Sequence, residues 1–394
     1  MNNRQGEKKD QVERGNSQIA CYNYLMLKLL FFIVLLFSLV PLPVFAQNAS
    51  YSQGFQKAKV ISIDKEGLKE VGGRKNPFQQ LTLELISGEG KGSKITIEHG
   101  GGVVIAASQK VRIGETLIVT KITQGNKSTY SVIDRYRLPS LLTITLIFFL
   151  IITLLTGKKG LGSIAGLIVS LLIIVLFIVP QILAGNDPLI VSIIGSLAIM
   201  LITLYLAHGF TSRTTIAVVA TFLSLVLTGI IAVIAVSVSK LSGLGSEDAY
   251  NLLMNTGKTI NVQGLLLGGI IIGSLGVLDD TTTTQSTTVA ELAHANPVYS
   301  MRQLFTSGMV IGKEHIASLV NTLVLAYAGA AIGIFIFIII SLQTHSQPWW
   351  VIFNSEIIAE EIVRTLAGSM GLVLAVPITT LLAAFFAKHE IKIN

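Results

Sequence analysis

The sequence predicts a membrane α-helical bundle of about seven transmembrane helices, preceded by a small exported all-β domain. Hydrophobic residues make up 51% of the chain and charged residues only 13%, whereas soluble domains carry about 25% charged residues. Seven later stretches are apolar over roughly the 20 residues that a span requires. Between the first apolar run and these stretches, apolar and polar residues alternate with the period of strands.

The N-terminus has the pattern of a signal peptide. A basic residue precedes the apolar run Leu29–Val40, and the small residue Ala46 ends the following segment, so residues 1–46 are expected to be cleaved after Ala46. An uncleaved anchor helix is the alternative, and Met26 is an alternative start of translation. The single cysteine, Cys21, precedes the apolar run, so a cleaved protein has no disulfide and no thiolate site.

Residues 47–137 form the predicted exported domain. Alternation and a Gly-Asn turn predict about five short strands, of which the clearest are Phe78–Ile86, Ser93–Glu98, Thr116–Thr123 and Ser128–Asp134. Such a set is typical of a small OB-like barrel. A fold of this kind assigns no ligand, and the segment holds no cluster of His, Asp or Glu. A spacer or a partner-binding domain is therefore expected.

Residues 138–387 form the predicted bundle. The spans are Leu138–Thr156, Leu161–Ala184, Pro188–Ala207, Thr214–Val238, Gln263–Leu278, Ile316–Leu342 and Leu366–Ala387. Starting outside, seven crossings place the tail 388–394 and the segment 279–315 in the cytoplasm. Loops predicted inside hold seven Lys or Arg residues and those predicted outside hold three, in agreement with the positive-inside rule. The predicted location is the plasma (cell) membrane.

Two segments between the spans are amphipathic. Asn296-Pro297 predicts an N-cap followed by the first residue of a helix. Ser355–Arg364 predicts a second helix, in which Glu360 and Arg364 are spaced to pair across one turn.

The fifth span carries the most informative pattern. Gln263–Leu278 rises only about 24 Å as a helix, which is less than the ~30 Å hydrocarbon core. A short, glycine-rich, interrupted span is a pointer to a transport site. Four-residue spacings of glycine also let another helix approach closely; the glycines are Gly264, Gly268, Gly269, Gly273 and Gly276.

Two acids and four threonines follow this span directly. If the helix continues, an oxygen-rich stripe shares one face: Asp280, Thr284, Thr287, Glu291 and His294. Four β-branched threonines are mediocre helix formers, so a break is equally compatible with the sequence. Ionisable residues at membrane depth are functional candidates, whereas acids at the cytoplasmic interface are solvated or cap a helix. Both interpretations of Asp279 and Asp280 stay open.

The later spans carry three further features. Pro377 lies inside the last span and is expected to kink it. Asn321 in the sixth span is expected to hydrogen-bond across helices. The string Gly273–Gly276 recurs in similar form at 368–371, which is compatible with coincidence or with a vestigial repeat.

Enzyme motifs are missing from the sequence. There is no H-E-x-x-H, no G-x-S-x-G and no Walker lysine loop. Glu291 and His294 have the spacing of di-metal carboxylate bundles, but the required second copy is missing. No catalytic residue and no cofactor is therefore expected, and no metal ligand set is defined. Basic residues do not cluster with aromatic residues, which argues against nucleic acid as a partner.

Three long strings give the chain a resemblance to a known family. They are Gly273–Pro297, Ser318–Gly329 and Glu361–Thr380. On these strings the sequence resembles the YibE/F-like family of bacterial multi-pass membrane proteins, over about residues 56 to 387. The resemblance implies an exported segment and a membrane bundle. It brings no reaction and no site residues, although members of the family look like permeases.

The leading hypothesis is a permease or an ion-coupled transport component that lies in the lipid bilayer. Its candidate site for a small ion or solute comprises Asp279, Asp280, Thr283, Thr284, Glu291, Asn321 and Thr379. Hard cations suit carboxylate and hydroxyl oxygens, and protons are equally allowed. The alternative is a non-catalytic membrane protein whose exported domain binds another protein. An intramembrane hydrolase is the remote third interpretation.

Overall fold

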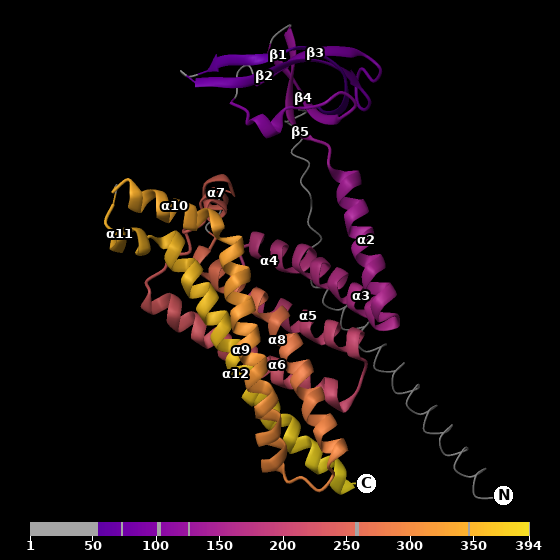
Figure 1. The fold of residues 1–394 in the computed structure, drawn as a ribbon, viewed down its shortest axis with the longest axis vertical. Helices are drawn as coiled ribbons and strands as arrows, with labels where there is room; N and C mark the ends of the chain where they lie inside the picture. Colours follow the sequence, from indigo (N-terminus) through magenta and orange to yellow (C-terminus); the bar gives the residue numbers. More distant parts are fainter. Residues whose placement is uncertain are drawn as a thin grey trace, which may run out of the picture. The chain divides into compact units, whose positions relative to one another are not determined.

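The computed structural model describes residues 54–71, 74–100, 104–124, 127–256, 260–345 and 347–393. The predicted signal peptide, residues 1–46, lies outside the described residues. The described chain divides into two compact units, of which the first ends at Ile151 and the second begins at Ile152 (Figure 1).

The first unit is built on a five-stranded antiparallel sheet in the order β3-β2-β1-β4-β5. Its elements are β1 (Phe55–Val71), β2 (Arg74–Leu85), β3 (Lys94–His99), the 3₁₀ turn η1 (Ala107–Gln109), β4 (Thr116–Gln124) and β5 (Lys127–Arg135). Leu81, Leu83 and Leu85 alternate along β2 and are buried in one apolar cluster. The two-residue alternation of the sequence is therefore confirmed as a half-buried sheet.

Two features of the sheet differ from the prediction. β1 is a 17-residue strand, and its register shifts between Val60 and Ser62 and again between Ile63 and Lys65. These irregularities break the alternation, so the strand is not visible as one pattern in the sequence. The described strands show no pairing of β3 with β5, so the expected barrel is not closed.

Among the described residues, seven helices are long and apolar enough to span a membrane, which agrees with the predicted count. They are Leu138–Thr156, Gly160–Leu183, Pro188–His208, Ser212–Val238, Val262–Ala295, Met301–Ala330 and Glu356–Lys388. The corresponding elements are α2 (Leu138–Thr156), α3 (Lys158–Ile173), η2 (Ile174–Ile178), α4 (Val179–Leu183), α5 (Pro188–His208), α6 (Ser212–Val238), α8 (Val262–Ala295), α9 (Met301–Ala330) and α12 (Glu356–Ile393). The shorter helices are α7 (Glu247–Thr256), α10 (Ile332–Gln343) and α11 (Trp349–Phe353).

Helix α8 is the centre of the helical unit. It packs against α5, α6, α9 and α12 (Figure 1). It also runs without a break from Val262 to Ala295, so the four threonines after Asp280 continue the helix. Tertiary packing overrides their modest helix propensity.

The helix after α8 begins later than the sequence predicts. Asn296 ends α8 as its C-cap, and α9 begins at Met301 behind a capping box at Ser300. The Ser300 hydroxyl accepts from the Gln303 amide N–H at 3.3 Å, and the Gln303 side-chain oxygen accepts from the Ser300 N–H at 2.8 Å. Two satisfied amides favour this start over Asn296-Pro297, so the predicted start was wrong.

The predicted sixth span, Ile316–Leu342, is also divided. α9 ends at Ala330, and a break at Ala331 separates it from α10.

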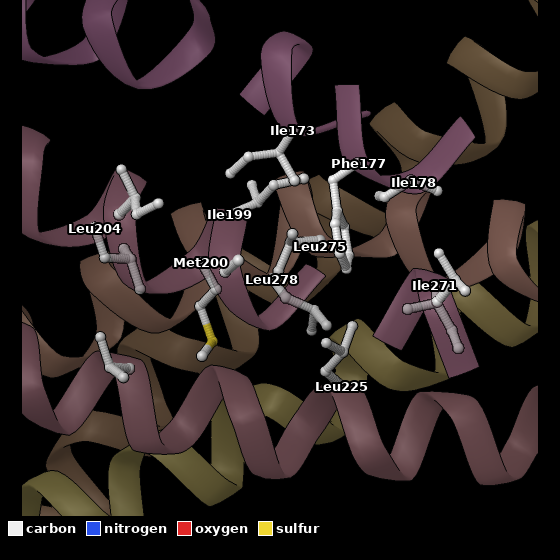
Figure 2. Packing of buried hydrophobic residues seen from close by; sticks show 14 of the residues in the cluster. Ile173, Phe177, Ile178, Ile199, Met200, Leu204, Leu225, Ile271, Leu275 and Leu278 are labelled. Carbon is white, nitrogen blue, oxygen red and sulfur yellow. The ribbon is translucent and has the colours of Figure 1, made fainter. Parts of the chain in front are cut away.

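A large apolar cluster fills the space between helices of the bundle. Figure 2 shows side chains of α3 and η2 meeting side chains of α5, α6 and α8. The labelled members are Ile173, Phe177, Ile178, Ile199, Met200, Leu204, Leu225, Ile271, Leu275 and Leu278.

Candidate functional site

A cavity of about 480 Å³ lies between α3, α5 and α8. Its polar lining is Ser163, Ser170, Thr203, His208, Asp279 and Asp280. Two carboxylates and three hydroxyls thus face one space. No Lys or Arg side chain lines it in the described part of the chain.

Small residues of α3 allow this arrangement. A Cβ atom added at Gly162 would lie 2.6 Å from the Leu206 carbonyl oxygen, and one added at Gly166 would lie 3.5 Å from the Thr203 methyl carbon. Glycine spaced by four residues therefore lets α3 approach α5 closely. The first turns of α3 lie beside the last turns of α5, so Ser163 and His208 mark one end of the cavity.

Asp279 has the least satisfied polar group of the cavity. Its Oδ2 accepts a long hydrogen bond of 3.3 Å from the Thr203 hydroxyl. Its Oδ1 is buried and has no hydrogen-bond partner among the described residues. A buried acceptor without a partner carries its desolvation cost, so this oxygen is available for a ligand that enters the cavity.

The depth of Asp279 follows from the helix geometry. It lies about 26 Å along α8 from Val262, and Thr203 lies about 8 Å from the end of α5 at His208. Since the contact with Thr203 falls inside an apolar span, the carboxyl group lies within that span and not beyond its end.

The far end of the cavity is apolar. Ile174, Ile199 and Leu275 line it there, and the buried side chains of Phe177 and Leu278 belong to the same cluster (Figure 2). Ile174 opens the π-helical turn η2, a local geometry that is frequent at functional sites.

Another face of α8 carries a second polar layer that sequence reasoning missed. The Thr282 and Thr221 hydroxyls lie 2.6 Å apart. The Gln285 side-chain amide donates to the Gly308 carbonyl oxygen at 2.9 Å and to the Thr380 hydroxyl at 2.7 Å. These bonds join α8 to α6, α9 and α12 and are fully inside the bundle, which indicates a structural role.

The predicted site residues do not converge. Of the predicted site residues, only Asp279 and Asp280 line the cavity. The predicted stripe of Asp280, Thr284, Thr287, Glu291 and His294 does share one face, but every member of it is exposed. Glu291 instead forms an ion pair of 2.6 Å with Arg213.

The other predicted residues lie apart from the cavity. Thr283 is half-buried, and its hydroxyl oxygen has no hydrogen-bond partner in the described chain. Asn321 is exposed on α9. Thr379 is fully buried and donates to the Ala375 carbonyl oxygen at 2.7 Å. α12 continues through Pro377 as one helix.

The glycines of α8 divide into two groups. Gly264 and Gly268 face α5, where an added Cβ atom would contact Pro188 and Ser192. At Gly269, Gly273 and Gly276 the described residues place nothing within 4 Å of an added Cβ atom. Helices therefore approach closely at Gly264 and Gly268, and they also do so at two further pairs with the same four-residue spacing, Gly162 with Gly166 and Gly308 with Gly312. That spacing was readable in the sequence.

The acids at the start of α12 bind the loop after α6. Glu356 accepts from the Ser242 N–H at 2.5 Å and from the Gly243 N–H at 3.1 Å, and Glu360 accepts from the Gly245 N–H at 2.8 Å. Because Glu360 bonds this loop, it does not form the predicted pair with Arg364.

The partner of Arg364 is Glu361, at 3.9 Å.

Comparison with known proteins gives a match to a protein family. A family model described as YibE/F-like protein matches residues 144–389. No curated protein and no solved structure matches the chain. The matched segment contains α3, α5 and α8, and thus the whole lining of the cavity. Because the match covers more than half of the chain, the protein belongs to the YibE/F-like family.

Proposed function

We propose that this protein is a multi-pass transport protein of the cell membrane and that Asp279 binds the transported or coupling cation. The observation that carries the proposal is the buried Asp279 Oδ1, which has no hydrogen-bond partner among the described residues and belongs to a side chain that lines a cavity within the helical bundle.

The chemistry of the cavity supports a cation. An ionised carboxylate in the hydrocarbon region costs free energy unless a positive charge compensates it. The described lining supplies only oxygen atoms, the ring of His208 and apolar groups. Carboxylate and hydroxyl oxygens bind hard cations, whereas an anion would meet two acids.

The charge distribution supports an orientation. The mouth of the cavity at Ser163 and His208 lies near the start of α3, where the sequence has Lys158 and Lys159, and basic residues between spans favour the cytoplasm. In this orientation the domain with the five-stranded sheet lies outside the cell. The protein then acts without a catalytic residue or a cofactor.

The test uses purified protein in liposomes. Wild type, Asp279→Asn and Asp280→Asn are titrated with H⁺, Na⁺, K⁺, Mg²⁺ and Mn²⁺, and thermal stability is measured before flux. The control is Glu291→Gln, because Glu291 is exposed and lies outside the cavity. One ion is expected to stabilise wild type and the control but not Asp279→Asn, and the flux of that ion is expected to be lost in Asp279→Asn.

The opposite result is equally clear. If all four proteins respond alike to every ion, the cavity has no transport role. The protein would then act as a membrane partner whose exported domain binds another protein.

A further inference from the structure

We infer that the ion exchanged in the cavity is a proton, which reaches Asp279 from the mouth at Ser163 and His208 only. This inference rests on the proposed function and specifies its ion and its sidedness.

The number of ligands around Asp279 favours a proton over a metal ion. Mg²⁺ requires six ligands in an octahedron, and Ca²⁺ takes six to eight oxygens. Among the described residues no group of three or more His, Cys, Asp or Glu side chains could hold a metal ion. The Thr203 hydroxyl is shared between Asp279 Oδ2 at 3.3 Å and the Met200 carbonyl oxygen at 3.4 Å. A proton needs only one lone pair of Asp279 Oδ1.

The groups that face Asp279 can relay a proton. From α3 the cavity receives the uncharged hydroxyls of Ser163 and Ser170, and from α5 it receives Thr203 and His208. From α8 it receives Asp280, which is exposed. The titratable neighbours are therefore one Asp and one His, the residue types that form proton relays in membrane proteins.

The apolar end of the cavity makes the access one-sided. Ile174, Ile199 and Leu275 line the cavity at this end, and they belong to the apolar cluster that also contains Phe177 and Leu278 (Figure 2). Hydrophobic constrictions of this kind exclude water and ions. A structure in which a carboxyl group is reached from one side only corresponds to one of the two states of an alternating-access cycle.

The first experiment measures the proton on Asp279 directly. Infrared difference spectra between acidic and alkaline buffers are recorded for the full-length protein in liposomes, for wild type, Asp279→Asn, Asp279→Glu and Asp280→Asn. We expect a titrating carbonyl band of a protonated carboxyl group in wild type and in Asp280→Asn. The band should disappear in Asp279→Asn and return, shifted, in Asp279→Glu.

Two results would overturn the inference. A band that is unchanged in Asp279→Asn shows that this residue does not carry the proton. A band that Na⁺, K⁺ or Mg²⁺ removes at constant pH shows that a metal ion occupies Asp279. In that second case the proposed transport function stands and only the identity of the ion is wrong.

The second experiment tests the sidedness and does not change Asp279. Gly276 lines the cavity, and the described residues leave space for a Cβ atom there. Since Cys21 is the only native cysteine, Gly276→Cys in a Cys21→Ser background gives a single reporter. The matched control is Gly269→Cys, an equally open position of α8 outside the cavity.

An impermeant maleimide is then added to one face of right-side-out or inside-out vesicles. The thiol of the Gly276→Cys variant should react only from the face at which α3 begins with Lys158, and the thiol of the Gly269→Cys variant should react from neither face. Reaction of the Gly276→Cys variant from the other face, or from neither face, contradicts the one-sided cavity.

Discussion

The contact between α6 and α12 predicts the direction in which a substitution changes the stability of the bundle. An added Cβ atom at Gly371 would contact the Thr228 hydroxyl and lie 2.9 Å from the Thr228 Cγ2. The Thr228 hydroxyl cannot turn away without loss, because it donates to the Ser224 carbonyl oxygen at 2.7 Å. Gly371→Ala should therefore destabilise the bundle. Gly273→Ala in α8 meets nothing within 4 Å in the described structure and is the matched control.

The two substitutions should change the free energy of unfolding in opposite directions. Overpacking typically costs about 1–3 kcal/mol, and a lost hydrogen bond adds about 0.5–1.5 kcal/mol. Replacing Gly by Ala in a helix interior returns roughly 0.5–1 kcal/mol. Gly371→Ala should thus lower the free energy of unfolding by about 1–3 kcal/mol, while Gly273→Ala should raise it by roughly 0.5–1 kcal/mol.

The assay is reversible unfolding of the purified protein in mixed micelles. Adding Thr228→Ala creates room for the new methyl group, so the double variant Gly371→Ala/Thr228→Ala should lose less stability than the two single changes combined. If Gly371→Ala is as stable as Gly273→Ala, or if the double-mutant cycle shows no coupling, α6 and α12 do not meet at this point.

Two further predictions concern polar contacts. Glu356→Gln should weaken three hydrogen bonds that its carboxylate accepts from the Ser242 hydroxyl and from the Ser242 and Gly243 amides. A hydrogen bond to a charged group is worth about 1.5–3 kcal/mol. The released loop should show faster amide exchange at residues 241–245. In the strand domain, the Lys110 ammonium 2.8 Å from Glu66, assisted by Gln79, holds the pKa of Glu66 below its ordinary value of 4.5. A carboxylate with a lowered pKa stabilises the fold above its unfolded pKa, and this stabilisation is lost as the pH falls through the folded pKa. Relative to the intrinsic exchange rate at each pH, the amide protection of β1 and β2 should therefore fall below about pH 4.5 in wild type, and this loss should diminish in Glu66→Gln.

The architecture of the bundle was readable because apolar length is a strong signal. Each span is a run of residues that can only be buried or lie in lipid, and the described part of the chain contains seven such helices. Helix ends were less readable. The start of α9 depends on whether Asn296 or Ser300 caps it, and both residue types cap helices well. The side chain of Gln303 decides between them.

The orientation of α8 could not be read from its own sequence. Periodicity correctly placed Asp280, Thr284 and Glu291 on one face, yet that face is exposed. The opposite face carries Thr282 and Gln285, which are as polar as the exposed threonines and are fully buried. Which polar face turns inward depends on how closely the neighbouring helices approach α8 and on which hydrogen-bonding groups they place against it.

Close approach by α9 explains the burial of Gln285. An added Cβ atom at Gly312 would lie 3.0 Å from the Gln285 side-chain nitrogen, so only a helix with glycine there can approach closely enough. The Gly308 carbonyl oxygen then accepts a hydrogen bond from the same side chain. The information that buries one face of α8 is therefore encoded in α9.

The same reasoning separates the two acids that the sequence could not distinguish. Asp279 and Asp280 are adjacent, and successive residues of a helix point about 100° apart. One side chain thus faces α5, where Thr203 donates to it, while the other lies at the exposed side. Gly166 of α3 brings its helix against Thr203, which encloses Asp279 and leaves Asp280 open. Under the proposed function, the buried Asp279 would bind the ion and the exposed Asp280 would lie at the solvated entrance, so two adjacent acids on one helix would serve both purposes.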